Sequence, residues 1–343
     1  MTASRNGLPL LPTMGIGSYA APGWFIAARR MIRDGGLGAG DIEELFDDAT
    51  RIVIADQIEA GVDVITDGEL RRQRFVYEMF DRIDGLTRTP PRRKLGIPGY
   101  DMAPSFVAEE VPSVSRGLGV VADFEALKRL VPDRALKIAI PGPLTFTSSI
   151  APGGVGAAAV LDALTGIVRA ELEALVAAGA DYVQLDEPSL PHPPHGLEPE
   201  DGAGVINRVL TGLGAWRAVH VCFGNNAGRP RADRRLDRLM AALEALDCDQ
   251  LVLEFANREM AGRECLAPLS ERFAIAAGVI DVKNWRLETP ADVARRIRQC
   301  LEHVAPDKLS VTADCGFSAL PRYLARQKLT AMVAGAKQVR AAL

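Results

Sequence analysis

Short apolar runs alternate along the chain with longer stretches in which apolar residues recur at helical spacing. The runs predicted to form buried β-strands are residues 11–16, 62–66, 136–140, 182–185, 218–222, 251–254, 274–279 and 309–312. A clear helix is predicted over 41–60, with Asp41 as N-cap and Glu44 at the capping-box position. Eight strands alternating with helices predict an α/β fold of the (βα)₈ TIM-barrel class.

Two further helices and one interruption complete the pattern. A helix over 156–178 ends before Gly179, and another begins at Thr289-Pro290, where proline suits the first helical position. Residues 86–115, rich in proline and arginine near their start, are predicted to be an insertion after the second strand–helix unit of a single domain spanning 1–343. An open doubly wound sheet is the alternative, but no G-x-G-x-x-G follows the first strand, which argues against a dinucleotide site.

Composition narrows the possible function classes. The 343 residues are 48% hydrophobic and 24% charged, with a formal net charge of -4, so there is no basic excess for nucleic acid. No apolar run reaches the roughly 18 residues that a membrane span needs, and the N-terminus does not resemble a signal peptide. Five irregularly spaced cysteines predict reduced thiols, and we expect a cytoplasmic protein acting on small molecules.

Metal-capable side chains fall at the carboxyl ends of predicted strands, where barrels place their sites. His220 and Cys222 are two positions apart in one strand and therefore share a face. Glu254 ends the next apolar strand, and Cys315 ends the last one. One nitrogen, two sulfur atoms and one carboxylate oxygen form a donor set that suits Zn²⁺.

Acidic side chains occur at two other strand ends. Glu69 follows the second strand, and the adjacent Asp186 and Glu187 end another, so only one of that pair points into the barrel. Two carboxylates at a barrel mouth can hold a substrate ammonium. The alternative is that they pair with nearby arginines, namely Arg71, Arg72 or Arg74. The insertion carries a basic cluster that is either a solvated face or a partner for an anionic group: Arg88, Arg92, Arg93 and Lys94.

Short motifs at or near the predicted strand ends run through nearly the whole chain. They are IGS at 16–18, DGE at 67–69, PGPLT at 141–145, VQLDEPSL at 183–190, HVCFGN at 220–225, LEF at 253–255, GVIDVK at 278–283 and ADCG at 313–316. In their order and strand-end placement they resemble the catalytic barrel of cobalamin-independent methionine synthase, in the superfamily shared with uroporphyrinogen decarboxylase.

The resemblance implies a zinc-dependent methyltransferase that methylates homocysteine to methionine. It implies that His220, Cys222, Glu254 and Cys315 bind the zinc. It also implies that the Ser of IGS, the Glu of DGE and the Asp of DEP, here Ser18, Glu69 and Asp186, bind homocysteine. Zinc would deprotonate the thiol, and Glu254 would give way to the substrate sulfur.

Two departures bear on the methyl donor and on the site. The tryptophan that stacks on folate in the family, shortly after the PGP turn, is absent, and the histidine expected after GVxD is Lys283. A corrinoid-borne methyl group, with a corrinoid protein as partner, is therefore favoured over folate. The alternative is thiol alkylation like that of epoxyalkane:coenzyme M transferase. A metal-free decarboxylase or a non-catalytic zinc protein fits less well, because neither explains both the metal set and the acid pair.

Overall fold

The computed structural model describes residues 7–72, 78–93, 102–225 and 233–343. The chain divides into two compact units. Unit 1 comprises Met1–Gln73, Asp123–Ile138 and Leu253–Leu343. Unit 2 comprises Arg74–Ala122 and Ala139–Val252.

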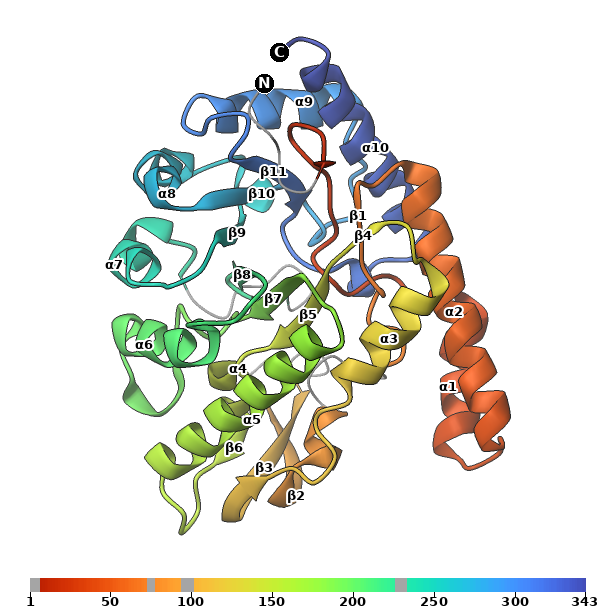
Figure 1. Cartoon of the computed structure of the whole chain (residues 1–343), viewed down its shortest axis with the longest axis vertical. Coiled ribbons are helices and arrows are strands. Elements are labelled where there is room, and N and C mark those ends of the chain that lie inside the picture. The colour runs from red at the N-terminus through yellow and green to blue at the C-terminus, as the bar shows by residue number, and fades with distance from the viewer. Residues whose placement is uncertain (1–6, 73–77, 94–101, 226–232) are drawn as a thin grey trace. The chain divides into compact units, whose positions relative to one another are not determined.

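The barrel strands pair in chain order (Figure 1). One sheet has the order β11-β10-β9-β8-β7-β5, with bounds β5 Ile138–Pro141, β7 Tyr182–Asp186, β8 Trp216–Val221, β9 Gln250–Glu254, β10 Ala274–Ile280 and β11 Leu309–Ala313. Beyond β11, the N-terminal segment continues the order, because Thr13 bridges to Val311 and Met14 bridges to Val64 of β1 (Val64–Ile65). Strand β1 then pairs with β4 (Ala135–Leu136), which lies just before β5 in the chain. This order closes on itself, and the predicted (βα)₈ barrel is confirmed.

The first predicted strand is much shorter than expected. Instead of extending over 11–16, it makes only the two bridges at Thr13 and Met14. Leu11 has a positive φ of 51°, and Pro12 has no N–H to donate, so neither residue can extend a regular ladder. Pro12 still accepts a hydrogen bond from Val311 N at 2.8 Å.

Helices follow the strands along the chain. The α-helices are α1 Gly23–Arg33, α2 Ala39–Ala60, α3 Val120–Leu130, α4 Pro143–Thr147, α5 Ala157–Ala177, α6 Pro199–Leu210, α7 Met240–Glu244, α8 Leu266–Arg272, α9 Pro290–Leu301 and α10 Arg322–Arg340. Short 3₁₀ turns are η2 Met79–Arg82, η3 Pro194–Gly196, η4 Leu236–Leu239, η5 Ala256–Arg258, η6 Arg263–Cys265 and η7 Phe317–Ala319. Within unit 1, α9 and α10 pack side by side (Figure 1).

The two predicted helix starts have different outcomes. Thr289 caps α9, because its hydroxyl accepts from Asp292 N at 3.1 Å and Asp292 accepts from Thr289 N at 3.0 Å. The predicted start of α2 is wrong. Its N-cap is Gly38, and Asp41 lies inside the first turn, where its carboxylate accepts the Gly38 N–H at 3.1 Å.

The segment expected at 86–115 forms a hairpin in unit 2. Strands β2 (Asp84–Arg93) and β3 (Met102–Ser113) pair antiparallel, and β3 also pairs with β6 (Ile150–Ala151). Phe106 of β3 stacks on Phe80 with ring centroids 4.3 Å apart, and Phe80 meets Phe146 of α4 edge-on at 5.5 Å. The hairpin is thus attached to the turn that follows β5.

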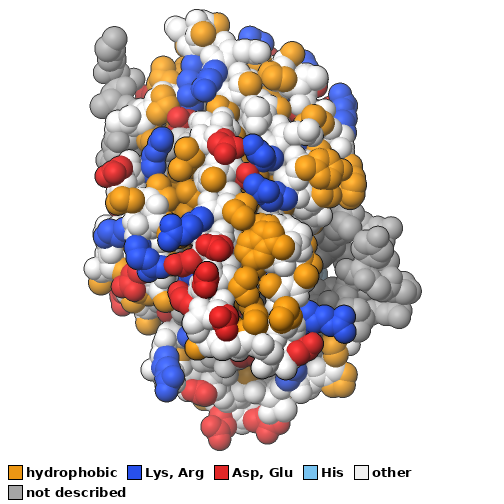
Figure 2. All heavy atoms as spheres, turned by 90° about the vertical axis from the view of Figure 1, so that its right-hand side faces the viewer, with side chains coloured by type: hydrophobic (Ala, Val, Ile, Leu, Met, Phe, Trp, Pro, Cys, Tyr) orange, Lys and Arg blue, Asp and Glu red, His pale blue; other side chains and the backbone are white. Residues whose placement is uncertain are grey.

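Charges of both signs are interspersed over the face in Figure 2, in keeping with the small net charge. Arg88 of the predicted basic cluster pairs with Asp81 at 2.8 Å. Lys94 lies outside the described residues, as do the side chains of Arg92 and Arg93. Among the described helices, none is long and apolar enough to cross a membrane.

A buried ionic network in unit 1 fixes the segment that connects β10 to α9. Lys328 of α10 is fully buried and donates to Asp281 O at 2.7 Å and to Glu288 Oε2 at 2.7 Å. The other oxygen of Glu288 accepts from Asp281 N at 2.9 Å and from Arg296 at 3.3 Å. Each buried charge therefore has an opposite charge and hydrogen-bond partners.

We expect Lys328→Met to lower the free energy of unfolding by about 3 kcal/mol, because it removes one partner of a buried ion pair and leaves a backbone carbonyl unsatisfied. Urea unfolding followed by circular dichroism measures this loss. Lys337→Met, on the exposed side of the same helix, is the matched control, with an expected change within about 0.5 kcal/mol. Equal effects of the two substitutions on the free energy of unfolding would contradict the assignment of Lys328 to a stabilising buried ion pair.

Candidate metal centre

In unit 2, the pairing of β7 with β8 places Asp186 opposite His220. Both side chains are buried, and His220 Nδ1 donates to Asp186 Oδ1 at 3.0 Å. Gln184 Nε2 donates to the same oxygen at 2.7 Å. A carboxylate can only accept, so it holds the proton on Nδ1 and directs the Nε2 lone pair away from itself. Metal-binding histidines commonly have this arrangement.

The electrostatic surroundings of His220 favour a cation. Burial lowers the pKa of the ring, but Cys222 and Asp186 together raise it to about 10. Nε2 is buried and has no hydrogen-bond partner among the described residues. A metal ion therefore competes with a proton for this nitrogen.

Glu187 points away from Asp186, as predicted for adjacent strand residues. Its carboxylate accepts from Leu144 N at 2.9 Å, Thr145 N at 3.1 Å and Thr145 Oγ1 at 2.8 Å. Burial raises its pKa to about 8. A Cβ on Gly142 would lie 2.1 Å from Glu187 Oε1, so glycine is needed there. Glu187 thus holds the turn after β5, and Asp186 faces His220.

In unit 1, Cys315 follows Asp314, which holds the turn after β9. Asp314 Oδ1 accepts from Phe255 N at 2.8 Å and from Ala256 N at 2.9 Å. Its Oδ2 accepts from Asn257 N at 2.6 Å and from the Asn257 side-chain amide at 2.8 Å. Burial raises the pKa of Asp314, whereas these four donors favour its charged form. The segments that carry Glu254 and Cys315 are thereby joined.

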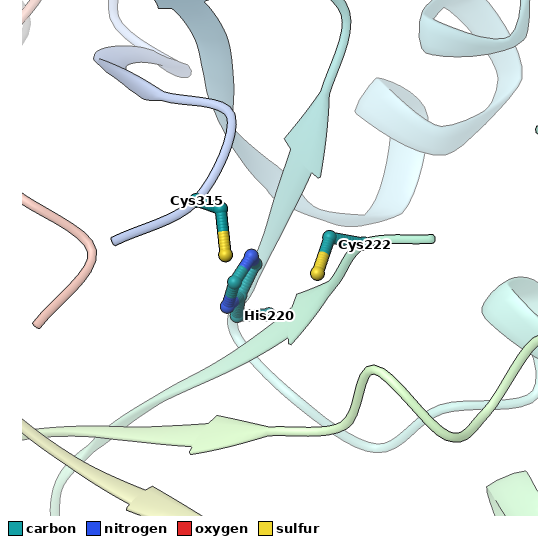
Figure 3. Close-up of side chains that lie close together, drawn as sticks. All are labelled: His220, Cys222 and Cys315. Carbon is teal, nitrogen blue, oxygen red and sulfur yellow. The ribbon is translucent and has the colours of Figure 1, made fainter. Parts of the chain in front are cut away.

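Three of the four predicted ligands come together. The ligand atoms of His220, Cys222 and Cys315 all lie within 4.8 Å of one another. Figure 3 shows both sulfur atoms directed toward the His220 ring. Two thiolates and one imidazole fit a tetrahedral zinc ion that keeps a fourth position for water or substrate, and the Nε2 atom without a partner is consistent with this use.

The fourth predicted ligand, Glu254, lies outside this group of three. Its carboxylate forms an ion pair with the Lys283 ammonium, and both side chains are almost completely shielded from solvent. The sequence places both residues at strand ends, but it does not indicate that they pair. The role of Glu254 as a zinc ligand stays a prediction.

Glu69 and Ser18 belong to unit 1. Glu69 has a left-handed backbone (φ 57°), which is strained for a residue other than glycine, and Arg72 Nη1 lies 3.9 Å from its Oε1. Arg72 also pairs with Asp123 at 3.3 Å, and burial raises the pKa of Asp123 to about 6. Arg71 pairs instead with Glu43 and Asp47, and Arg74 lies outside the described residues.

Ser18 lies against the segment after Cys315. Ser18 O accepts from Phe317 N at 2.8 Å, and Ser18 Oγ is 3.4 Å from Ser318 Oγ. A Cβ on Gly316 would lie 1.8 Å from Ser18 Oγ. Glycine after Cys315 therefore makes room for the hydroxyl.

Comparison with known proteins assigns the chain to a family. The family model described as "Cobalamin-independent synthase, Catalytic domain" matches residues 11–199 and 218–338. The chain belongs to the cobalamin-independent methionine synthase family. A methionine synthase from Saccharolobus islandicus is 34% identical over 336 residues, covering 97% of this chain and 96% of the relative. One from Sulfurisphaera tokodaii is 35% identical over 334 residues, covering 97% and 94%.

A solved member of the same family has a similar fold. The B12-independent methionine synthase from Shewanella sp. W3-18-1, solved in complex with selenomethionine, superposes with a TM-score of 0.84 at 26% identity. The match covers 97% of this chain and 98% of that one. The family resemblance predicted from the motifs is therefore confirmed.

Proposed function

We propose that this chain is a zinc-dependent methyltransferase that transfers a methyl group to the sulfur of homocysteine, giving methionine. The observation that carries the proposal is the convergence of His220, Cys222 and Cys315, with His220 oriented by Asp186. Its relatives are named methionine synthases, which supports homocysteine as the acceptor. A metal-free decarboxylase does not account for a group of two thiols and one imidazole whose ligand atoms lie within 4.8 Å of one another.

Bound zinc supplies the positive charge that keeps a substrate thiol deprotonated at neutral pH. The chain's own residues position the reactants. Asp186 orients the His220 ring through Oδ1, which leaves lone pairs on its Oδ2 for a substrate ammonium. Glu69 supplies a second carboxylate for that ammonium, and Ser18 a hydroxyl for the amino-acid end of the substrate.

The stretch after the PGP turn bears on the methyl donor. Thr147 and Ser149 are buried, and Thr147 Oγ1 donates to Pro143 O at 2.7 Å, so these side chains offer no flat ring to a pterin. Trp24 and Trp285 are exposed, in α1 and in the segment after β10. We therefore propose a corrinoid-borne methyl group as donor, in preference to methyl-folate.

The metal assignment predicts about one zinc per chain. Cys222→Ser and Cys315→Ser should each remove most of the zinc and the activity, because each deletes a thiolate ligand. Cys300→Ala, which removes a buried thiol from α9, is the control and should retain the metal. Plasma emission spectrometry of the purified proteins measures the content. A fully active, zinc-free Cys315→Ser protein would show the assignment to be wrong.

The substrate assignment predicts a thiol that carries an ammonium. Glu69→Gln should raise the KM for homocysteine about tenfold or more, since a charged hydrogen bond contributes roughly 1.5–3 kcal/mol. Zinc content should not change. Glu125→Gln, at an exposed position of α3, should leave the KM unaltered. If coenzyme M, a sulfonated thiol, is clearly preferred, the epoxide-alkylation alternative replaces this proposal.

The donor assignment predicts slow turnover with methyl-folate triglutamate and faster turnover with methylcobalamin. Stacking of an aromatic side chain on a nucleobase contributes about 1–3 kcal/mol, and we take the same value for stacking on the pterin. Its absence corresponds to roughly a tenfold loss of affinity for methyl-folate. Steady-state rates at equal homocysteine concentration compare the two donors. Efficient folate turnover without any cobalamin-supported rate would refute it.

A further inference from the structure

We propose that Asp67 and Asp123 share one proton in the free protein, and that the substrate ammonium replaces this proton when it binds beside Glu69. The inference rests on the proposed function, from which it takes the ammonium at Glu69. It makes Asp67 and Asp123 specificity-determining residues, because a substrate without a positive charge cannot drive the exchange. The observation behind it is a surplus of buried negative charge around one arginine of unit 1.

Three carboxylates lie near the Arg72 guanidinium. Arg72 Nε donates to Asp123 Oδ2 at 3.3 Å, and Arg72 Nη1 lies 3.9 Å from Glu69 Oε1. Asp67 is the third carboxylate. Burial lowers the pKa of Arg72, but the three carboxylates together raise it above its ordinary value. Arg72, Glu69 and Asp67 are all buried, so their charges act on one another with little screening by water.

Asp67 lacks the hydrogen bonds that a buried carboxylate normally receives. The residue is 1% exposed, and neither Oδ1 nor Oδ2 accepts a hydrogen bond from a described residue. Burial raises the pKa of Asp67, although Arg72 and nearby backbone amides lower it. An ionised carboxylate in such surroundings is costly, and a bound proton removes that cost. The neutral carboxyl group can then donate a hydrogen bond as well as accept one.

Asp123 is the second carboxylate that disfavours full ionisation. Burial raises its pKa to about 6, Arg72 opposes this shift, and the charge of Asp67 adds to it. Two carboxylates that interact in this way titrate as a pair, and the proton belongs to the pair and not to either residue. Asp67 and Asp123 therefore hold one proton in slightly acidic to neutral solution.

The neighbouring arginines are engaged by other acids. Arg71 Nε lies 3.8 Å from Asp123, but its terminal nitrogens pair with Glu43 and Asp47 of α2. Arg129 of α3 pairs with Asp47 as well, at 3.1 Å. These two cations therefore balance the acids of α2, and the negative surplus beside Arg72 remains.

The charge of this cluster explains why a cation replaces the proton. The three carboxylates and Arg72 carry a formal charge of −2 when all four are ionised, and of −1 when one proton is bound. An ammonium beside Glu69 adds one positive charge, which lowers the pKa of the pair and expels the proton. The cluster then carries −1 again. The exchange thus admits the ammonium without changing the buried charge.

Calorimetric titration of the purified protein with methionine tests the exchange. Methionine keeps the ammonium but has no ionising thiol, so a released proton must come from the protein. Titrations in buffers of different ionisation enthalpy should show release of about half a proton or more per methionine near pH 6. The Kd for methionine should fall as the pH rises through the pKa of the pair and then level off, because the proton no longer competes.

Asp67→Asn should reduce the proton release at least threefold and flatten the pH dependence of the Kd, since the remaining carboxylate ionises more easily. Asp123→Asn should have the same effect and is the second variant if Asp67→Asn does not fold. Glu125→Gln, at an exposed position of α3, is the matched control and should leave the release unchanged. The ligand control is 4-(methylsulfanyl)butanoate, which is methionine without its ammonium. It should bind at least about tenfold more weakly and release no proton.

The inference is overturned if methionine binds to the unchanged protein without proton release between about pH 5.5 and pH 8. It is also overturned if Asp67→Asn and Asp123→Asn both retain the full release, since the proton would then come from elsewhere. If methionine does not bind, or binds no better than the analogue without an ammonium, the proposed amino-acid substrate itself fails. Tight, ammonium-dependent binding without proton exchange refutes only this inference.

Discussion

Buried carboxylates that accept backbone N–H groups hold the turns on which the candidate site is built. The backbone leaves the sheet ladder where a strand ends, and its amides then need new partners. Asp314 supplies them for the residues after Glu254, and Glu187 supplies them for the residues after Gly142. Because each carboxylate adjoins a candidate site residue in sequence, Cys315 and Asp186, any shift of these turns would also shift those side chains.

The sequence predicts well the features that follow from local periodicity. Strands have a period of two residues, so the sharing of a face by His220 and Cys222 and the divergence of Asp186 and Glu187 could both be predicted. The placement of function at strand ends follows from the barrel class. The barrel rule also places Cys315 at the end of the last strand, and its sulfur lies within 4.8 Å of the ligand atoms of His220 and Cys222.

The features that the sequence did not predict depend on side-chain pairing across long separations or on competition between local caps. Glu254 and Lys283 are 29 positions apart, and Asp186 and His220 are 34 apart, so no short-range pattern links them. A lysine or a glutamate at a strand end can face solvent, contact a substrate or lie beside a metal, so the residue types alone do not predict that the two side chains pair. At α2, the Asp41 side chain could either cap the helix as its N-cap residue or accept a hydrogen bond from an earlier N–H. The structure has the second arrangement, with Gly38 N as the donor.

Closure next to β11 has a consequence for synthesis of the protein. Thr312 donates its hydroxyl hydrogen to Met14 O across 298 residues, and Thr13 bridges to Val311 in the same region. At translation rates of about 5–20 residues per second, the N-terminal segment waits roughly 15–60 s for its partner to leave the ribosome. During that interval the segment can pair with β1 through Met14 and Val64, but its edge toward β11 has no partner. The nascent barrel therefore stays open at this edge until its last strand has emerged.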